Sequence, residues 1–297
     1  SYKGIDFAED NNFSLIIALD CGIKAIDKVA YAFKKEVDFI ICDHHRPGAE
    51  IPKAKAVLDP KQEDCDYPFK ELCGCGVGFK LIQALASKKG ATIDDLVLYL
   101  DLVATAIGAD IVPIVGENRI LAYHGLKVIN ENPRPGFEAI LKQVKKEKLT
   151  ITDVVFIIAP RINAAGRMKH GNHAVTLLCE TDINLAAEYA IDIDTYNTDR
   201  RDADKRITIE ALTQIEKNKE QDRFTSIVYN ENWHKGVIGI VASRLIETYY
   251  RPTLVFTKSG EMLAASARSV KGFDVYNALE KCSEHIEQFG GHKYAAG

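Results

Sequence analysis

Two apolar stretches near the start of the chain each end in an aspartate. The stretch FSLIIALD (13–20) ends in Asp20, and VDFIICD (37–43) ends in Asp43. Continuous apolar runs of this length are typical of strands that are buried on both faces. Between the two runs, apolar residues recur at positions 26, 29, 30 and 33, which is the spacing of one helix face. The pattern therefore predicts a strand, a helix and a second strand.

A crossover helix makes the two flanking strands parallel, so Asp20 and Asp43 should emerge at the same carboxyl edge of the sheet, where open α/β folds bind ligands. A third strand is predicted in AKAVLDP (54–60), followed by a glycine-rich turn and a helix in GCGVGFKLIQALASKKG (74–90). The turn lacks the Gly-Lys-Ser/Thr ending of a phosphate loop.

The pattern changes along the second half of the chain. From about 119 to 220 it is helical, and the charged stretch 183–220 is typical of a connecting helix with a solvated face. Strands are then predicted at 224–230, 252–258 and 262–269, with a helix at 237–250. We therefore expect an α/β protein with a first domain over 1–180, a connector over 181–220 and a smaller α/β domain over 221–297.

Composition limits the class of protein. The chain has 297 residues, 46% hydrophobic and 27% charged, and no apolar run approaches the length of a membrane span. The first residues do not form a signal peptide, and the seven cysteines contain no Cys-x-x-Cys pair. These features predict a cytoplasmic protein with reduced thiols and no membrane contact. The CGCG segment (73–76) has no matching second half of a zinc site and is interpreted as a tight turn.

The formal net charge of −4 argues against a protein that coats polyanions indiscriminately, so any nucleic-acid site must be local. The basic runs KQVKKEK (142–148) and DRR (199–201) are interpreted as solvated helix faces rather than DNA contacts.

The residues CDHHRPG (42–48) follow the second predicted strand with an aspartate and two histidines. Together with Asp20 they mix carboxylate and imidazole donors, a combination that suits Mn²⁺ better than Ca²⁺ or Mg²⁺. The alternative is a helix N-cap followed by two unrelated histidines.

Six segments now resemble, in order and wording, the motifs of RecJ-type single-strand exonucleases of the DHH phosphoesterase superfamily. They are ALDCGI (18–23), CDHHRPG (42–48), LDLVATAIGADIVPI (100–114), RINAAGRM (161–168), WHKGVIGIVASRL (233–245) and FGGHKYAAG (289–297). The resemblance covers nearly the whole chain. It implies a parallel-sheet DHH domain joined by a long helical connector to a smaller α/β DHHA1 domain.

The resemblance implies roles for the residues near the strand ends. Asp20 and His44 would be metal ligands, Asp43 would be a ligand or orient its neighbour, and His45 would face the metals or the scissile phosphate. Two Mn²⁺ or Mg²⁺ ions would bind the phosphate and lower the pKa of a water molecule. No serine or cysteine has a convincing base and oxyanion arrangement.

A further metal ligand is expected in the apolar segment 96–115, which contains two carboxylates. The resemblance assigns this role to Asp110, because AIGAD is similar to a strand end of the superfamily. Asp101 is the second candidate. A carboxylate in an apolar segment is costly unless it has a partner.

The family's first motif, an Asp-x-Asp pair before ALDCGI, is not seen in the 19 residues that precede Asp20. Other Asp-x-Asp pairs occur at 64–66 and 192–194, in a predicted loop and on the charged helix. We therefore expect a fragment of a longer polypeptide that lacks the first motif and a C-terminal domain. Its metal site would be incomplete, and it would bind metal poorly and cut weakly.

The second half of the chain is expected to bind the substrate. Arginine matches phosphate oxygens, glycines permit close approach, and Ser266 with Arg268 is suited to a terminal 5′ phosphate. The candidate substrate-binding residues are Arg161, Asn163, Arg167, His234, Lys235, Gly236, Ser266, Arg268, Gly290, Gly291 and His292.

The resemblance implies a 5′→3′ exonuclease that hydrolyses single-stranded DNA from a 5′-phosphorylated end in DNA repair and recombination. It also implies partners such as a single-strand-binding protein or a helicase. Two alternatives stay open: a DHH phosphodiesterase for short oligonucleotides or cyclic dinucleotides, and a nucleic-acid-binding relative that has lost its metals.

Overall fold

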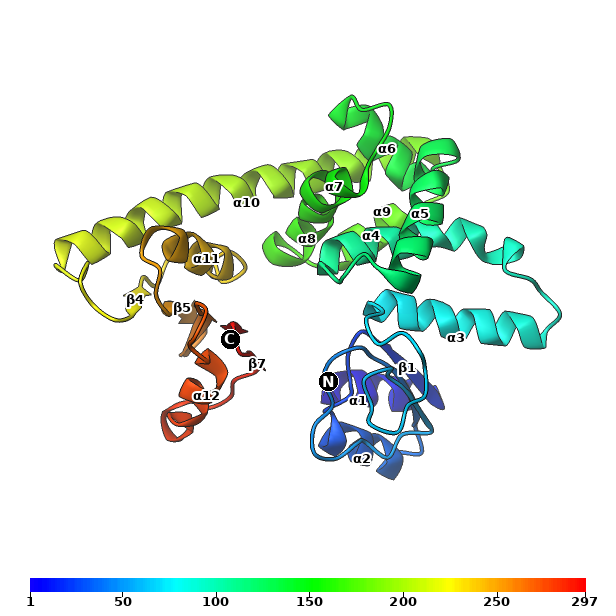
Figure 1. The fold of residues 1–297 in the computed structure, drawn as a ribbon, viewed down its shortest axis with the longest axis horizontal. Helices are drawn as coiled ribbons and strands as arrows, with labels where there is room; N and C mark the ends of the chain where they lie inside the picture. The colour runs from blue at the N-terminus through cyan, green and yellow to red at the C-terminus, as the bar shows by residue number, and fades with distance from the viewer. The chain divides into compact units, whose positions relative to one another are not determined.

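The computed structural model describes residues 1–297, which form two compact units (Figure 1). Unit 1 contains Ser1–Pro160 and Glu180–Ala187, and unit 2 contains Arg161–Cys179 and Glu188–Gly297. The predicted domain limits at 180 and 220 divide the same helical region differently.

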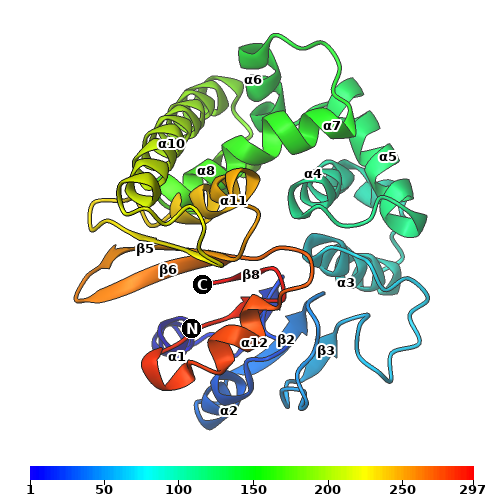
Figure 2. The same cartoon turned by 60° about the vertical axis from the view of Figure 1, so that its left-hand side comes forward.

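Unit 1 contains the predicted strand, helix and strand. Strands β1 (Leu15–Leu19), β2 (Asp38–Cys42) and β3 (Ala56–Leu58) form a parallel sheet in that order, and β2 and β3 are seen side by side in Figure 2. Helix α2 (Ile26–Lys34) connects β1 to β2, and α1 (Tyr2–Asp10) precedes them. The parallel arrangement expected from the crossover rule is confirmed.

The two faces of this sheet differ in burial. Helices α1 and α2 cover the face that carries Ile16 and Phe39. On the other face, the side chains of Leu15, Ile17 and Leu19 are 43%, 45% and 54% exposed. The prediction that this strand is buried on both faces is therefore wrong, because helix packing covers this second face only in part.

Helices make up the rest of unit 1. Gly74–Lys88, which follows the sheet, forms α3 and packs against β1 and β2. The packing between α4 and α5 is the most extensive in the unit. The elements after α3 are η1 (Asp94–Tyr99), α4 (Leu100–Asp110), α5 (Gly116–Glu131), α6 (Pro135–Val144), α7 (Ile151–Asp153) and the π-helical turn η2 (Val154–Ile158).

Unit 2 begins with helices. Helices α8 (Ala159–Met168) and α9 (Asn172–Cys179) precede α10, which runs without a break over Ile183–Lys217 (Figure 1). This continuous helix confirms the predicted charged helix. None of the helices in the molecule combines the length and the apolar character that crossing a bilayer requires.

A mixed sheet completes unit 2, in the order β4, β5, β6, β8, β7. Helices α10 and α11 cover one face of it, where Val228 and Val255 are buried, and α12 packs on the other face against Ala267. The elements are β4 (Ser226–Tyr229), α11 (Ile238–Thr248), β5 (Thr253–Ser259), β6 (Met262–Arg268), α12 (Val275–Glu280), η3 (Ser283–His285), β7 (Gly291–His292) and β8 (Ala295–Ala296).

Candidate active site

Three aspartates follow the three parallel strands of unit 1. Asp20 follows β1, Asp43 follows β2, and Asp59 follows β3. The first two were predicted from the apolar runs that precede them. The third was missed, although AKAVLDP has the same pattern of an apolar strand that ends in an aspartate.

Asp20 has a left-handed backbone conformation, with φ of 64°. Its amide donates a hydrogen bond to the carbonyl of Cys42 at 2.8 Å, which ties the end of β1 to β2. The carboxylate packs directly on the first residue of α3, because a Cβ added to Gly74 would lie 2.1 Å from Oδ1 of Asp20. The CGCG segment, interpreted as a tight turn, is thus the helix start that fixes Asp20.

His44 lies at the centre of the acidic group. Its side chain is 9% exposed, and Nε2 lies 3.1 Å from Oδ1 of Asp20 and 3.3 Å from Oδ2 of Asp110. The interaction with Asp20 raises the pKa of His44, against the opposing effect of burial. Both ring nitrogens are buried without a well-aligned hydrogen-bond partner. A buried imidazole in this state suits a cation ligand better than a core residue.

Asp110 reaches His44 from a helix rather than from a strand. It is the last residue of α4, so the predicted strand-end position is wrong, although the residue lies where the prediction placed its side chain. A carboxylate at the negative end of a helix dipole is unfavourable without a compensating charge. Its only ion-pair neighbour is His44, and its side chain is 42% exposed, so this carboxylate is accessible to a cation.

Asp101 has a different environment at the first turn of the same helix. It is 1% exposed, and its two carboxylate oxygens lie 2.7 Å and 2.5 Å from Nη2 and Nε of Arg134. A buried carboxylate that is paired in this bidentate way is already neutralised. The geometry therefore favours Asp110 over Asp101 as a metal ligand.

Asp43 organises the loop that carries the two histidines. It is 1% exposed and accepts hydrogen bonds from the amides of Ile23 at 2.9 Å and His44 at 2.8 Å. Its Oδ1 also lies 2.7 Å from Nδ1 of His45. Burial alone would raise the pKa of Asp43, but these hydrogen bonds hold it below its usual value. With its proton on Nδ1, His45 presents Nε2 as a lone pair for a cation or a proton.

Asp59 lies close enough to Asp43 and His44 for their charges to affect its pKa. It is 2% exposed, and Oδ2 is buried without a hydrogen-bond partner. Burial is the largest effect and raises the pKa of Asp59, and the charge of Asp43 raises it further. The amide of Lys61 opposes this by donating a hydrogen bond to Oδ1.

The residues of this rim are suited to a divalent cation. Asp20, His44 and His45 each offer a ligand atom within 4.8 Å of the others, and Asp110 adds a carboxylate next to His44. Imidazole and carboxylate together favour Mn²⁺ over a cation that prefers oxygen alone.

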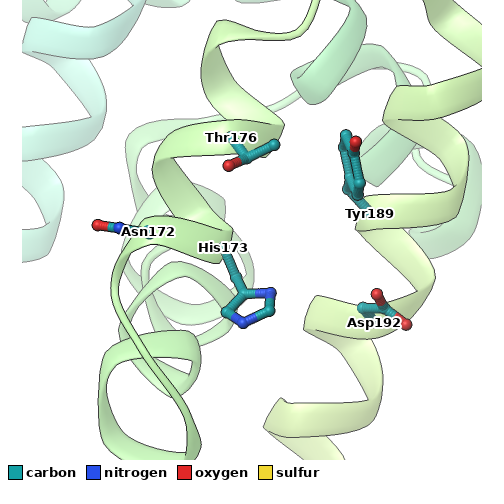
Figure 3. Close-up of a pocket in the computed structure, with 5 residues that line it drawn as sticks. All are labelled: Asn172, His173, Thr176, Tyr189 and Asp192. Atoms are coloured by element: carbon teal, nitrogen blue, oxygen red, sulfur yellow. The ribbon is translucent and has the colours of Figure 1, made fainter.

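The Asp-x-Asp pairs at 64–66 and 192–194 do not join this group. Asp64 and Asp66 are exposed in a loop of unit 1. In unit 2, Asp194 is paired with Arg161 at 2.8 Å, and Asp192 lines a hollow between α9 and α10. Figure 3 shows Asp192 across this hollow from His173.

Unit 2 contains a separate group of predicted residues at the start of α11. Ser266 and Arg268 lie on β6 and point to the face that α11 covers, because a Cβ added to Gly239 would lie 2.9 Å from Ser266 Oγ and 3.0 Å from Arg268 Nη2. Arg268 donates to Ser266 Oγ at 3.2 Å and pairs with no carboxylate. Burial lowers the pKa of Arg268, and the charge of Arg167 lowers it further. Arginine, hydroxyl and a helix N-terminus together form a favourable anion site.

Arg167 is placed by a close contact between two backbones. A Cβ added to Gly236 would lie 2.2 Å from the carbonyl oxygen of Arg167, so only glycine permits this approach. The guanidinium of Arg167 donates a hydrogen bond to the Gly236 carbonyl at 3.3 Å. His234 accepts a hydrogen bond from the Gly236 amide through Nδ1 at 3.1 Å, and Lys235 donates to Ser259 Oγ at 3.3 Å.

The remaining residues that were predicted to bind the substrate are less available to a ligand. Arg161 is engaged with Asp194, and Asn163 is exposed on α8. The Gly290 amide, which was expected to face a phosphate, instead donates to the Gly297 carbonyl at 2.9 Å because the segment forms a strand pair. Gly291 and His292 form strand β7 of that pair.

The fold and the two sites define a class of protein. The family model "DHH family, N-terminal domain" matches residues 3–107, and the "DHHA1 domain" model matches residues 222–297. The chain therefore combines a DHH domain, which holds Asp20, Asp43 and His44, with a DHHA1 domain, which holds Ser266 and Arg268.

Comparison with similar proteins narrows this class to a particular group of relatives. The chain is 39% identical over 293 residues to the single-stranded-DNA-specific exonuclease RecJ of Bacillus subtilis, a match that covers 97% of this chain and 36% of that protein. It is 36% identical over 313 residues to the RecJ of Escherichia coli, a match that covers 99% of this chain and 54% of that protein. The chain thus spans between about a third and about half of the length of these relatives.

Solved structures agree with this relationship. RecJ from Thermus thermophilus in complex with Mn²⁺ matches all of this chain and 44% of its own, with a TM-score of 0.89 and 28% identity. An exonuclease RecJ bound to manganese matches 98% of this chain and 72% of its own, with a TM-score of 0.83 and 28% identity. The resemblance to RecJ-type exonucleases that the six motifs indicated is confirmed.

Proposed function

We propose that this chain contains metal-binding and substrate-binding residues of a protein that carries out metal-dependent 5′→3′ exonucleolytic hydrolysis of single-stranded DNA, in DNA repair and recombination. The weak metal binding and weak cutting expected of the chain by itself stay predictions. The observation that carries the proposal is the convergence of Asp20 and Asp110 on Nε2 of His44, at 3.1 Å and 3.3 Å. The two carboxylates are 60% and 42% exposed, and together they leave a net negative charge beside the buried imidazole that a cation would neutralise. The names of the relatives supply the substrate class, and the motif resemblance supplies the direction.

In this proposal the residues of the rim have distinct roles. Asp20, His44 and Asp110 hold Mn²⁺ or Mg²⁺, which supplies a polarised phosphate and a water of lowered pKa when bound. Asp43 orients His45 through the hydrogen bond between its Oδ1 and Nδ1 of His45. His45 then keeps Nε2 directed to a cation or to a proton that leaves the attacking water.

The anion site of unit 2 would bind the 5′ end. Arg268, Ser266 and the first turn of α11 provide donors for a terminal phosphate, and Arg167 adds a second guanidinium. A terminal phosphate carries more charge than a phosphodiester and has more oxygens for bidentate contact. We therefore expect a preference for 5′-phosphorylated strands.

The proposal is tested with the full-length protein and three substrates: a long 5′-phosphorylated single strand, its duplex, and a dinucleotide. In Mn²⁺ we expect mononucleotides to be released from the 5′ end of the single strand, and His44→Ala to remove this activity. The exposed His285→Ala variant is the matched control. Cleavage of the dinucleotide alone would replace the exonuclease with a short-oligonucleotide phosphodiesterase, and strand binding without cleavage would favour a non-catalytic relative.

Partner proteins such as a single-strand-binding protein or a helicase, and a cytoplasmic location, stay predictions from the sequence. Co-purification of the full-length protein with each candidate partner tests the first, and fractionation of cells tests the second.

A further inference from the structure

Ile111, the residue that follows Asp110, has an unusual backbone conformation. It ends helix α4 with φ of 57° and ψ of 35°, which is the left-handed region. A side chain that is branched at Cβ is strained there, because Cβ lies too close to a backbone carbonyl oxygen. Of the six non-glycine residues with positive φ, the other five are polar and unbranched at Cβ: Asn12, Asp20, Glu36, Lys145 and Lys219.

The surroundings of Ile111 hold this strained turn in place. Val112 packs against the apolar core to which α4 contributes, and the carbonyl of Pro113 accepts a hydrogen bond from Asn118 at 3.0 Å. The side chain of Asn118 is fully buried and also donates to the Glu71 carbonyl at 2.5 Å. A strained residue persists where neighbouring contacts determine its conformation, and such residues gather at functional sites.

The fold itself gains little from an isoleucine at this position. Ile111 is 79% exposed, so its side chain contributes little to the apolar core. A single exposed isoleucine is common on protein surfaces and needs no explanation by itself. Here, however, it occupies a backbone conformation that glycine or asparagine adopts more readily. A reason for this residue type therefore has to lie outside the fold.

The position of Ile111 limits what its side chain could contact. The carboxylate of Asp110, the preceding residue, lies 3.3 Å from Nε2 of His44 in the acidic group. Neighbouring α carbons are about 3.8 Å apart, so Ile111 is within reach of a nucleotide whose phosphate is held at Asp110 through a cation. An isoleucine has no hydrogen-bonding group for phosphate. It is, however, one of the apolar side chains that pack on bases in nucleic-acid complexes.

We propose that Ile111 packs against a nucleobase that adjoins the scissile phosphodiester at the metal site. This inference rests on the proposed function, because it takes the acidic group as the place where that phosphodiester is bound. The contact is apolar and does not depend on base identity, so it adds affinity without sequence preference. A base in a duplex has its faces covered by its neighbours, so the contact favours a single strand.

The test uses the full-length protein, Mn²⁺ and two 5′-phosphorylated single strands, which are identical except that the first two nucleotides of one strand are abasic. We expect Ile111→Gly to lower kcat/KM for the strand with bases by about tenfold, because an apolar contact is lost, and to leave kcat/KM for the abasic strand unchanged. The wild-type protein should lose about the same factor on the abasic strand. Ile111→Leu keeps an apolar side chain without the branch at Cβ, so it should retain most of the difference between the strands.

The midpoint of thermal unfolding gives a second readout, which does not depend on activity. Ile111→Gly should raise this midpoint, because glycine adopts φ of 57° without strain. Lys145→Gly is the matched control, because Lys145 is exposed and ends helix α6 in the same left-handed conformation. It should also raise the midpoint, but it should not alter the ratio of kcat/KM between the two strands.

Three results would overturn the inference. Ile111→Gly with the same ratio of kcat/KM between the strands as Lys145→Gly would mean that no base is contacted. A lower unfolding midpoint in Ile111→Gly would mean that the side chain packs against another part of the full-length protein. A weaker affinity for Mn²⁺ in titration calorimetry would mean that Ile111 positions Asp110 instead. If the wild-type protein cuts neither strand, the proposed function fails and the inference fails with it, whereas the first three results leave the proposed function intact.

Discussion

The two units of this chain each gather charges of one sign, but the signs are opposite. In unit 1, Asp20 and Asp110 converge on His44 with no lysine or arginine paired to either. In unit 2, Arg167 and Arg268 come together with no carboxylate paired to them. Like charges in close proximity destabilise a fold, so each group is understandable as half of an interaction with a ligand of the other sign.

Elsewhere the same units neutralise their buried charges internally. Asp101 in unit 1 is matched by Arg134, and Arg251 in unit 2 is matched by carbonyls. The contrast separates charges used for folding from charges left for a ligand. The residue type alone does not separate these two kinds of charge. Asp101 and Asp110 belong to the same helix, and Arg268 and Arg251 belong to the same unit, yet the members of each pair have different partners.

The largest expected effect comes from the centre of the acidic group. We expect His44→Ala to lower kcat/KM for single-stranded DNA by about 10³-fold, or about 4 kcal/mol of activation free energy, because the imidazole ligand is lost. The midpoint of thermal unfolding should change little, because the side chain of His44 makes no aligned hydrogen bond. Steady-state kinetics and calorimetry on the same preparation measure both. A loss of activity that merely follows a loss of fold would argue against a ligand.

Arg134→Met tests the internally neutralised pair. It leaves Asp101 buried without its partner, so we expect the unfolding free energy to fall by about 3–5 kcal/mol. Asp110→Asn should do the reverse, with little change in stability and a large loss of metal affinity. Denaturant unfolding and titration calorimetry with Mn²⁺ compare the two variants. If Arg134→Met folds normally but no longer binds Mn²⁺, Asp101 rather than Asp110 would be the ligand.

Gly74→Ala tests whether the acidic group depends on the exact position of Asp20, without changing any charge. The added Cβ would lie 2.1 Å from Oδ1 of Asp20, so the carboxylate must move. We expect the affinity for Mn²⁺ to fall by about 10–100-fold, the range typical when a group that positions a ligand is disturbed. Gly4→Ala in α1, where the nearest atom is 3.6 Å from the added Cβ, is the control. Equal Mn²⁺ affinity in both variants would mean that Asp20 does not need this position.

The smallest expected effect is the stabilisation of each unit by its own ligand. At a concentration about ten times its Kd, Mn²⁺ should raise the unfolding free energy by about 1.4 kcal/mol, and inorganic phosphate should do the same through unit 2. Asp20→Asn should remove only the first effect and Arg268→Gln only the second. Thermal shift measurements with each ligand provide the readout. A single variant that removes both effects would show that the two groups of charge are not independent.

The sequence predicted the parts of the fold that local pattern determines. Continuous apolar runs and the crossover rule placed Asp20 and Asp43 at one edge of a parallel sheet, and β1 to β3 confirm this arrangement. The secondary structure of segment 96–115 was harder to predict. Its apolar residues are nearly continuous, so their spacing does not distinguish a helix from a strand. Resemblance therefore selected Asp110, but on the wrong kind of element.

What could not be predicted depends on packing between distant segments. Arg200 stands in a charged run that looks solvated, and only the approach of the groups on α8 and α11 shows that it is half-buried. The contact of Gly74 with Asp20 joins residues far apart in the chain, so no local pattern contains it. Asp59 could have been found, since it repeats the strand-end pattern of the two aspartates before it.

The left-handed backbone at Asp20 has a consequence for substitution experiments. With φ of 64°, this position suits asparagine and glycine as well as aspartate, because these residues adopt the left-handed region most readily. Of these two replacements, asparagine removes the charge and also keeps the size of the side chain, which makes it the more informative substitution at this strand end.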